Sequence, residues 1–346
     1  MSYSIIKMEP GIHRQAIKEL WARNIRRNFN GRFNWLYEEQ PLQCTKTWLA
    51  LDDSTQNVVG GGTIYPRRIH YFGKEMTIGI AADFAINREH RVFGPALKLQ
   101  QTISRSGLNG YECIFAYPSK ASQGIFKRAG YEEIGHSSTW VKLLRTQNKL
   151  LPALKLRPLA RVCAFVADKL LLLHDKLRLL ALFPKTVIEE TVSCDGLEDL
   201  WKDAKTGYSI TGVKHGEYLK WRYSMNDYRF FCIYDRKKEN LIGYIVFQKQ
   251  NKVAEVLDLF CRNHKKTLLS LLLKFSSEMR KQSMHSICLN YFGNSEFTDK
   301  LKKLLFFKRP TRRTCMLFLN KRIPASIRRE LMAENNWFLF EGEMDL

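Results

Sequence analysis

Five short patterns occur twice in this 346-residue chain, in the same order and about 180 residues apart. Each copy has a W-x-Y-x-x-Gln/Asn segment, an apolar strand ending in glycine, a strand carrying an aspartate, an apolar helix, and a strand ending in tyrosine. The strand and W-x-Y pairs are residues 35–40 with 221–226, 58–60 with 241–243, 82–84 with 257–259, and 114–117 with 288–291. Repetition of whole patterns at one spacing is typical of stacked or duplicated fold units. We therefore predict two similar halves.

The first half has the element pattern of an α/β domain. Apolar patterning predicts strands at residues 3–8, 45–51, 57–65, 67–72, 76–86, 111–117 and 131–142. Helical spacing, with Pro95 as a first helical residue and Gly130 as a helix end, predicts helices at residues 12–27, 95–106 and 119–129. Because strands and helices alternate, we assign the chain to the α/β class, which some schemes count as α+β.

The segment between the halves differs in composition. Residues 143–185 hold nine Lys and Arg against two acidic residues, and a leucine-rich helix is predicted at about residues 159–182. We therefore predict a first domain at 1–145, a basic helical connector at 146–186 and a second domain at 187–346. The helix suits a position wedged between two domains. It equally suits an anionic membrane surface, contacted through residues 149–182 with basic flanks at Lys149, Lys155, Arg157 and Arg178.

Charge and cysteine usage limit the partners and the compartment. The 56 Lys and Arg residues against 34 Asp and Glu give a net charge of +22, which predicts an anionic partner: a nucleotide cofactor, an anionic membrane or RNA. The eight cysteines form no C-x-x-C, so we predict small buried hydrophobic residues, with no disulfide framework and no metal site. Neither a signal-peptide pattern nor an apolar stretch of about 20 residues occurs. We predict a cytoplasmic protein, with peripheral attachment to the inner face of the membrane as an extension.

One segment has the pattern of a phosphate site. A strand carrying Asp83 runs into a turn with Gly94, and a helix begins at Pro95, so that Arg91-x-x-Gly94-x-Ala96 spans the turn. Small residues let the backbone approach a ligand closely, and the first turn of a helix offers free N–H groups. A pyrophosphate fits such a turn, and Arg88 and Arg91 would add positive charge at its rim.

This turn resembles the pyrophosphate loop of the GNAT acyltransferases, Gln/Arg-x-x-Gly-x-Gly/Ala. Residues 119–131 resemble the GNAT helix that ends in Gly-Phe or Gly-Tyr, and Gly130 follows Gly94 by 36 residues. The specific resemblance covers residues 75–135. It implies two GNAT-like domains, each with a mixed, mostly antiparallel sheet flanked by helices, and acyl-CoA, expected to be acetyl-CoA, as the co-substrate of N-acyl transfer to a primary amine. Tandem proteins of this kind are often tied to bacterial surface-polysaccharide synthesis, which implies an amino sugar or lipid-linked saccharide precursor as acceptor.

The resemblance also implies roles for individual residues. Phe84, Ala85 and Ile86 would pair with the pantetheine. The remaining cofactor-binding residues follow the loop and the next helix: Arg91, Val92, Phe93, Gly94, Pro95, Ala96, Ser119, Ser122 and Phe126. Asp83 is the candidate base, or else a strand-end aspartate bonded to backbone, with Glu89 and His90 as alternatives. Tyr117 is the candidate acid, or else a core aromatic residue. Phe126 and Ser119 depart from the Tyr and Asn that the family frequently has, which puts the acid step in doubt.

Several alternatives stay open. Residues 262–269 lack the glycine motif, so we expect no cofactor in the second half, which would instead help shape an acceptor cleft between the halves. Trp35, Tyr37, Trp221 and Tyr223 would line that cleft or else belong to the core. The competing functions are an aminoacyl-tRNA-dependent Fem-type transferase, for which the net charge suits a nucleic acid, and a non-catalytic protein that binds CoA or glycan.

Overall fold

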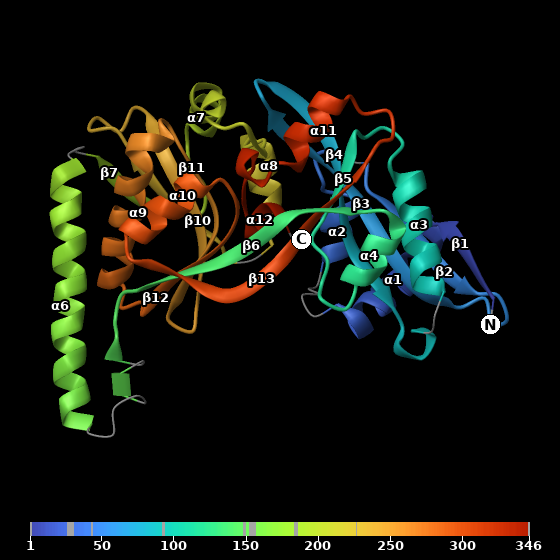
Figure 1. The fold of residues 1–346 in the computed structure, drawn as a ribbon, viewed down its shortest axis with the longest axis horizontal. Coiled ribbons are helices and arrows are strands. Elements are labelled where there is room, and N and C mark those ends of the chain that lie inside the picture. Colours follow the sequence, from blue (N-terminus) through green and yellow to red (C-terminus); the bar gives the residue numbers. More distant parts are fainter. Residues whose placement is uncertain are drawn as a thin grey trace. The chain divides into compact units, whose positions relative to one another are not determined.

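The computed structural model describes residues 2–25, 31–42, 44–91, 94–147, 150–151, 157–182, 186–225 and 227–344 (Figure 1). The chain forms two compact units that are not consecutive in sequence. Unit 1 comprises Met1–His136, Arg313–Asn336 and Met344–Leu346, and unit 2 comprises Ser137–Arg312 and Trp337–Glu343. Each unit has a mixed sheet with helices packed on it, as the α/β assignment predicted. The sequence-based boundaries at 145 and 187 remain a prediction.

The sheet of unit 1 has the strand order β1-β2-β3-β4-β5-β13. The strands are β1 (Tyr3–Lys7), β2 (Lys46–Asp52), β3 (Val58–Tyr71), β4 (Lys74–Ile86), β5 (Cys113–Ala116) and the end of β13 (Phe306–Leu319). Four antiparallel strands are followed by β5, which is parallel to β4 and antiparallel to β13. The prediction of two strands at 57–65 and 67–72 was wrong, because the hairpin pairing with β4 continues through Pro66 opposite Gly79.

Helices α1 (Pro10–Asn24), α2 (Arg32–Tyr37), α3 (Pro95–Gly107), α4 (Gln123–Ala129) and α11 (Ala325–Met332) complete unit 1. Helix α3 lies directly on the sheet, since a Cβ on Gly107 would come within 2.1 Å of Ile64 Cδ1. The core between them contains Trp48, Leu99 and Ile103, each at most 5% exposed. Close packing of α3 on β3 fixes where the N-terminus of α3 lies, next to the end of β4.

The sheet of unit 2 has the order β6-β12-β11-β10-β9-β7, with β14 on β12. Its strands are β6 (Glu132–Leu143), β7 (Val187–Thr191), β9 (Arg229–Tyr234), β10 (Leu241–Gln250), β11 (Val253–Cys261), β12 (Ser286–Gly293) and β14 (Phe338–Phe340), and β8 (Ile210–Gly212) is a short further strand. Its helices are α6 (Arg157–Leu182), α7 (Leu197–Ala204), α8 (Gly216–Arg222), α9 (His264–Lys281), α10 (Ser295–Lys303) and α12 (Glu341–Met344).

Both units contain an antiparallel hairpin, then a helix, then a strand parallel to the hairpin's second strand. In unit 1 these are β3, β4, α3 and β5; in unit 2 they are β10, β11, α9 and β12. Duplication of one ancestral half remains a prediction from the sequence. The strand that pairs with β5 on its other side is β13, and the strand that pairs with β12 on its other side is β6. In each unit this neighbouring strand comes from a distant part of the chain.

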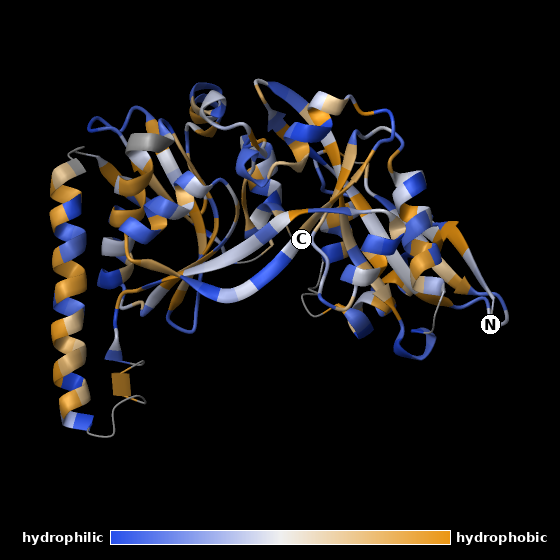
Figure 2. Ribbon diagram, viewed as in Figure 1, coloured by the Kyte–Doolittle hydropathy of each residue, from blue (hydrophilic) through white to orange (hydrophobic). Residues whose placement is uncertain are grey.

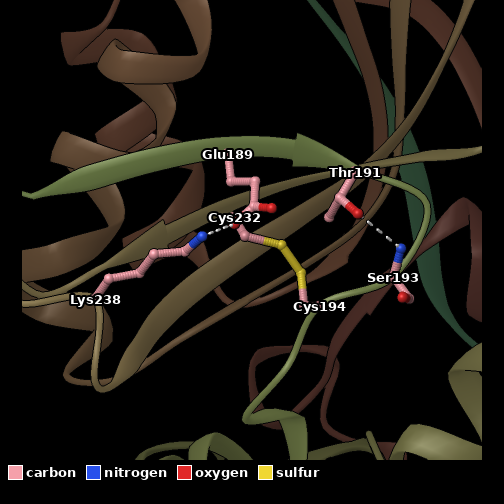
Figure 3. Close-up of a disulfide and its surroundings, with 6 residues drawn as sticks. All are labelled: Glu189, Thr191, Ser193, Cys194, Cys232 and Lys238. Atoms are coloured by element: carbon pink, nitrogen blue, oxygen red, sulfur yellow. Dashed lines mark hydrogen bonds and ion pairs between the residues drawn. A yellow bond between two sulfur atoms is a disulfide. The ribbon is translucent and has the colours of Figure 1, made fainter.

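The prediction of no disulfide was wrong for one pair of cysteines. Cys194 and Cys232 form a disulfide with a Cα–Cα distance of 6.5 Å (Figure 3). Strands β7 and β9 are antiparallel neighbours, and the chain leaving β7 turns back beside β9. Of the other described cysteines, Cys44 and Cys163 are exposed and Cys288 is half-buried, while the remaining three are buried as predicted.

The described residues contain no cluster suited to a metal ion and no helix with the length and apolarity needed to span a bilayer.

Candidate functional site

Strands β4 and β5 separate in the middle of unit 1. They pair in parallel only at residues 79–81 with 114–116. Beyond Ala81, β4 continues to Ile86 and stays paired with β3 on its other edge. The edge of residues 82–86 that faces β5 is therefore not used by that strand. Backbone N–H and C=O groups on such an edge can bind an extended ligand in the manner of an added strand.

A bulge lies at the point where β4 leaves β5. Gly61 pairs with Ala85 and Thr63 pairs with Ala82, so Asp83 and Phe84 both lie opposite Gly62. Asp83 has a φ of 54°, in the left-handed region that non-glycine residues rarely occupy. A Cβ at position 62 would lie 2.6 Å from Ile103 Cδ1, so a larger residue there would force the Ile103 side chain to move. Bulges of this kind re-aim side chains and often lie beside functional sites.

The bulge directs Asp83 and Phe84 to different partners. The Asp83 carboxylate accepts a hydrogen bond at 2.5 Å from the guanidinium of Arg32, the first residue of α2, and the two side chains are 4% and 2% exposed. The Arg32 guanidinium also lies 5.5 Å from the Trp21 ring centroid. Tyr37 completes this buried polar cluster, and burial raises the pKa of its hydroxyl. Phe84 instead packs edge-on against Phe126 of α4.

The N-terminus of α3 follows the end of β4 closely. A short 3-10 turn at Arg88–His90 leads to Gly94, whose φ is 129°, and Pro95 begins the helix. A Cβ at Gly94 would meet nothing within 4 Å, so its surroundings are open. Val92 and Phe93 lie outside the described residues. Arg91 is bonded to the protein itself: its Nε donates to the Ile86 carbonyl at 2.9 Å and its Nη2 donates to Asn24 Oδ1 at 3.0 Å.

The remaining predicted site residues lie at the start of α4 and in the turn before α3. Ser119 and Ser122 bond to each other, Oγ to Oγ at 3.0 Å. Phe126 is 3% exposed and packs edge-on against Tyr131 as well as Phe84, so it belongs to the core. Tyr117 is half-buried, with the Arg313 guanidinium 5.4 Å from its ring centroid. Of the alternative bases, Glu89 is exposed, and His90 Nδ1 is bonded to the Tyr3 hydroxyl at 3.1 Å.

The four aromatic residues considered for an acceptor cleft pack inside their own units. Trp35 is 1% exposed, Trp221 6% and Tyr223 8%. The fourth, Tyr37, is bonded to Thr47 in the polar cluster.

A pocket of about 600 Å³ in unit 1 lies at the other end of β4, lined in part by Tyr71, Lys74, Glu75 and Glu330, and it shares no residue with the predicted acyl-CoA site.

Unit 2 has a related bulge, but its own chain fills the position beside it. β11 pairs with β12 only up to Val256, and beyond that β14 pairs with β12 at residues 338–340. Asp258, at the bulge of β11, bonds to Lys214 Nζ at 2.6 Å, and Lys214 also bonds to Glu343 of α12 at 2.7 Å. Helix α9 is preceded by Asn263 rather than glycine. The segment 338–343 thus occupies the space that β11 and β12 leave between them.

No protein-family model and no curated protein matches the chain in sequence. Solved structures do match it. A protein of Enterococcus faecalis V583 described as a probable N-acyltransferase has a TM-score of 0.64 at 12% identity, over 92% of this chain and 73% of that chain. A GCN5-related N-acetyltransferase from Anabaena variabilis has a TM-score of 0.64 at 16% identity, with the same coverage. The chain has the GNAT fold.

A third solved structure differs more in sequence and still matches nearly the whole chain. Saccharomyces cerevisiae N-myristoyltransferase, solved with myristoyl-CoA bound, has a TM-score of 0.55 at 10% identity, over 96% of this chain and 89% of that chain. The GNAT fold predicted from the loop at Gly94 and the helix ending at Gly130 is confirmed. Identities of this size establish the fold, and the activity has to be argued from the site.

Three features of this candidate site were not anticipated from the sequence. Arg32, the partner of Asp83, lies in a segment without any recognisable motif. Gly62 could have been noticed, because three consecutive glycines inside a strand indicate close backbone packing. Thr314, whose hydroxyl accepts a hydrogen bond from Gln123 Nε2 at 2.9 Å, reaches the start of α4 from β13, almost 200 residues later in the chain.

Proposed function

We propose that unit 1 transfers an acyl group from an acyl-CoA to a primary amine. The observation that carries this proposal is the departure of β4 from β5, with the start of α3 at Gly94 and Pro95 just beyond the end of β4. The first N–H groups of α3 would bind the pyrophosphate of CoA, since a helix N-terminus favours anions. The pantetheine would then lie along residues 84–86 and bond to backbone groups on the edge of β4 that β5 does not use.

The proposed reaction is direct attack of the amine on the thioester. The amine nitrogen forms a bond to the carbonyl carbon, the carbon–sulfur bond breaks, and the CoA thiolate leaves while the nitrogen loses a proton. We assign the proton to Asp83, reached directly or through one water molecule. Its ion pair with Arg32 holds the carboxylate in place at the bulge. Tyr117 is the proposed donor to the thiolate.

The acceptor and the acyl chain are proposed from the resemblance alone. We propose acetyl transfer to an amino sugar or to a lipid-linked saccharide precursor. The likeness to an N-myristoyltransferase makes chain length a point to test, because acetyl and long acyl groups need very different space beyond the thioester.

Binding and turnover should be measured separately. Thermal stabilisation by acetyl-CoA, longer acyl-CoAs and tRNA would distinguish an acyl-CoA enzyme from a tRNA-dependent one, because a ligand of the folded state raises the melting temperature. Release of free CoA in the presence of amine panels would then test catalysis. Stabilisation by tRNA alone would contradict the proposal, and stabilisation by CoA without turnover of any amine would favour a binding protein.

A further inference from the structure

Helix α6 presents a long row of exposed apolar side chains. Among the described residues, fourteen large apolar side chains are exposed, and eight of them belong to α6: Leu159, Val162, Phe165, Val166, Leu170, Leu173, Leu177 and Leu180. Each of the eight is more than half exposed. Figure 2 shows α6 as a largely apolar helix with polar residues interspersed along it. Exposed apolar surface of this extent usually marks an interaction site.

The opposite face of α6 attaches the helix to unit 2. Ala160 and Ala164 are buried on that face. Asp175 is buried as well, and its carboxylate accepts bonds from Lys142 at 2.7 Å and from Arg280 of α9 at 2.8 Å. Asp168 accepts a bond at 2.7 Å from the backbone N–H of Thr146. Both acidic residues of α6 are thus turned toward the protein and used there.

The charged groups left on the outer side of α6 are all basic. Arg157, Arg161, Lys169, Lys176 and Arg178 are exposed. At about 100° per residue, Arg161, Lys169 and Lys176 fall along one edge of the apolar row. Lys169 Nζ lies 5.2 Å from the ring centroid of Phe165, so cation and apolar group share one surface. The exposed surface of α6 therefore combines apolar side chains with positive charge alone.

We infer that α6 docks the protein on an anionic lipid surface, lying parallel to it with Val166, Leu170, Leu173 and Leu177 turned into the bilayer. An apolar face with basic flanks is the pattern of interfacial helices, and each cation near an anionic leaflet adds to the attraction. The helix does not qualify as a bilayer-spanning segment, which agrees with attachment in the plane. A second copy of α6 is a poorer partner, because two such faces would bring their basic edges together without an acidic group between them.

Co-sedimentation of the full chain with vesicles tests this inference. The probes are vesicles of phosphatidylcholine alone and of phosphatidylcholine mixed with phosphatidylglycerol. Binding is expected only to the mixed vesicles and is expected to weaken at high salt. L170E with L177E is expected to weaken binding at least about tenfold, since two inserted leucines become charged. K169Q with K176Q removes two cations from the basic edge and should weaken binding several-fold at low salt.

Matched controls make the outcome decisive. I12E alters an apolar side chain of unit 1 that is 72% exposed, and K220Q with K303Q removes two exposed cations of unit 2 away from α6; both should bind like the wild type. Circular dichroism checks that each variant is folded. Failure of the wild type to bind, equal binding to neutral vesicles, or unchanged binding of the L170E and L177E variant would overturn the inference. A dimer that L170E and L177E dissociate, without vesicle binding, would identify a second copy as the partner and overturn it as well.

Discussion

Arg32 and Asp83 form a buried ion pair, 2.5 Å from nitrogen to oxygen, at the bulge where β4 leaves β5. The two residues are 51 positions apart, and each is almost inaccessible to solvent. The pair holds a non-glycine residue in a left-handed conformation at the edge that we assign to acyl-CoA. Unit 2 has an analogous pair, Lys214 with Asp258, at the bulge of β11.

Replacing Arg32 with Met should destabilise the protein by about 3–5 kcal/mol, because it leaves the Asp83 carboxylate buried without its counter-charge. The double variant R32M and D83L should recover most of this loss. Chemical denaturation followed by circular dichroism measures both. K214M in unit 2 is the matched control: it should lower stability comparably and leave the affinity for acyl-CoA unchanged. A single R32M variant as stable as the wild type would show that the pair is not a structural element.

D83N tests the chemical role of the same residue. The amide keeps the size and a hydrogen-bond acceptor but cannot take up a proton, so turnover should fall by about 100-fold or more while acyl-CoA affinity is retained. Single-turnover kinetics and calorimetric binding separate the two effects. Unchanged turnover would exclude Asp83 as the base and direct attention to Glu89.

Gly94→Ala should weaken CoA binding by about tenfold, or ~1.4 kcal/mol, because its φ of 129° does not suit an alanine and the turn before α3 would shift. Gly73→Ala is the control. Gly73 also has a positive φ, 86°, with nothing within 4 Å of its Cβ position, but it lies in the turn between β3 and β4. Calorimetry should show normal CoA affinity for G73A. Equal affinities for G94A and the wild type would remove the turn from the CoA site.

The disulfide between Cys194 and Cys232 closes a loop of 38 positions, and such cross-links stabilise proteins by about 2–4 kcal/mol. Reducing agent should lower the denaturation midpoint of the wild type toward that of C194S. It should leave C194S itself unchanged. C163S, on the exposed surface of α6, should behave like the wild type under both conditions. Mass mapping of the unreduced chain that finds both thiols free would contradict the pairing.

Buried tyrosines should make the protein less stable at alkaline pH. Burial raises the pKa of Tyr131, Tyr208, Tyr223 and Tyr244, so the folded state retains their protons at pH values where the unfolded state loses them. The free energy of unfolding should therefore be constant with respect to these groups below pH ~10 and fall above it, by about 1.4 kcal/mol per pH unit for each group. Y131F should remove one group's share of the slope. A Y131F variant whose stability falls with the same slope as that of the wild type above pH ~10 would contradict this.

The sequence alone determined the features that depend on neighbouring residues. The turn at Gly94, the helix start at Pro95 and the helix end at Gly130 follow from the conformational freedom of glycine and the fixed φ of proline. Because those local signals stand at a family-typical spacing, they were sufficient to predict the GNAT fold. The apolar and basic composition of α6 was also evident from the sequence, although not which face it exposes.

Tertiary structure decided everything that joins distant segments. Arg32 pairs with Asp83, Cys194 bonds to Cys232, and β13 pairs with β5. Sheet pairing and helix packing bring these distant residues together. No local sequence pattern indicates such a partner. The same holds for the outer face of α6. Asp168 is hydrogen-bonded to Thr146, and Asp175 forms ion pairs with Lys142 and Arg280. Because this packing turns both acidic residues toward the protein, the exposed surface of α6 is apolar and positively charged.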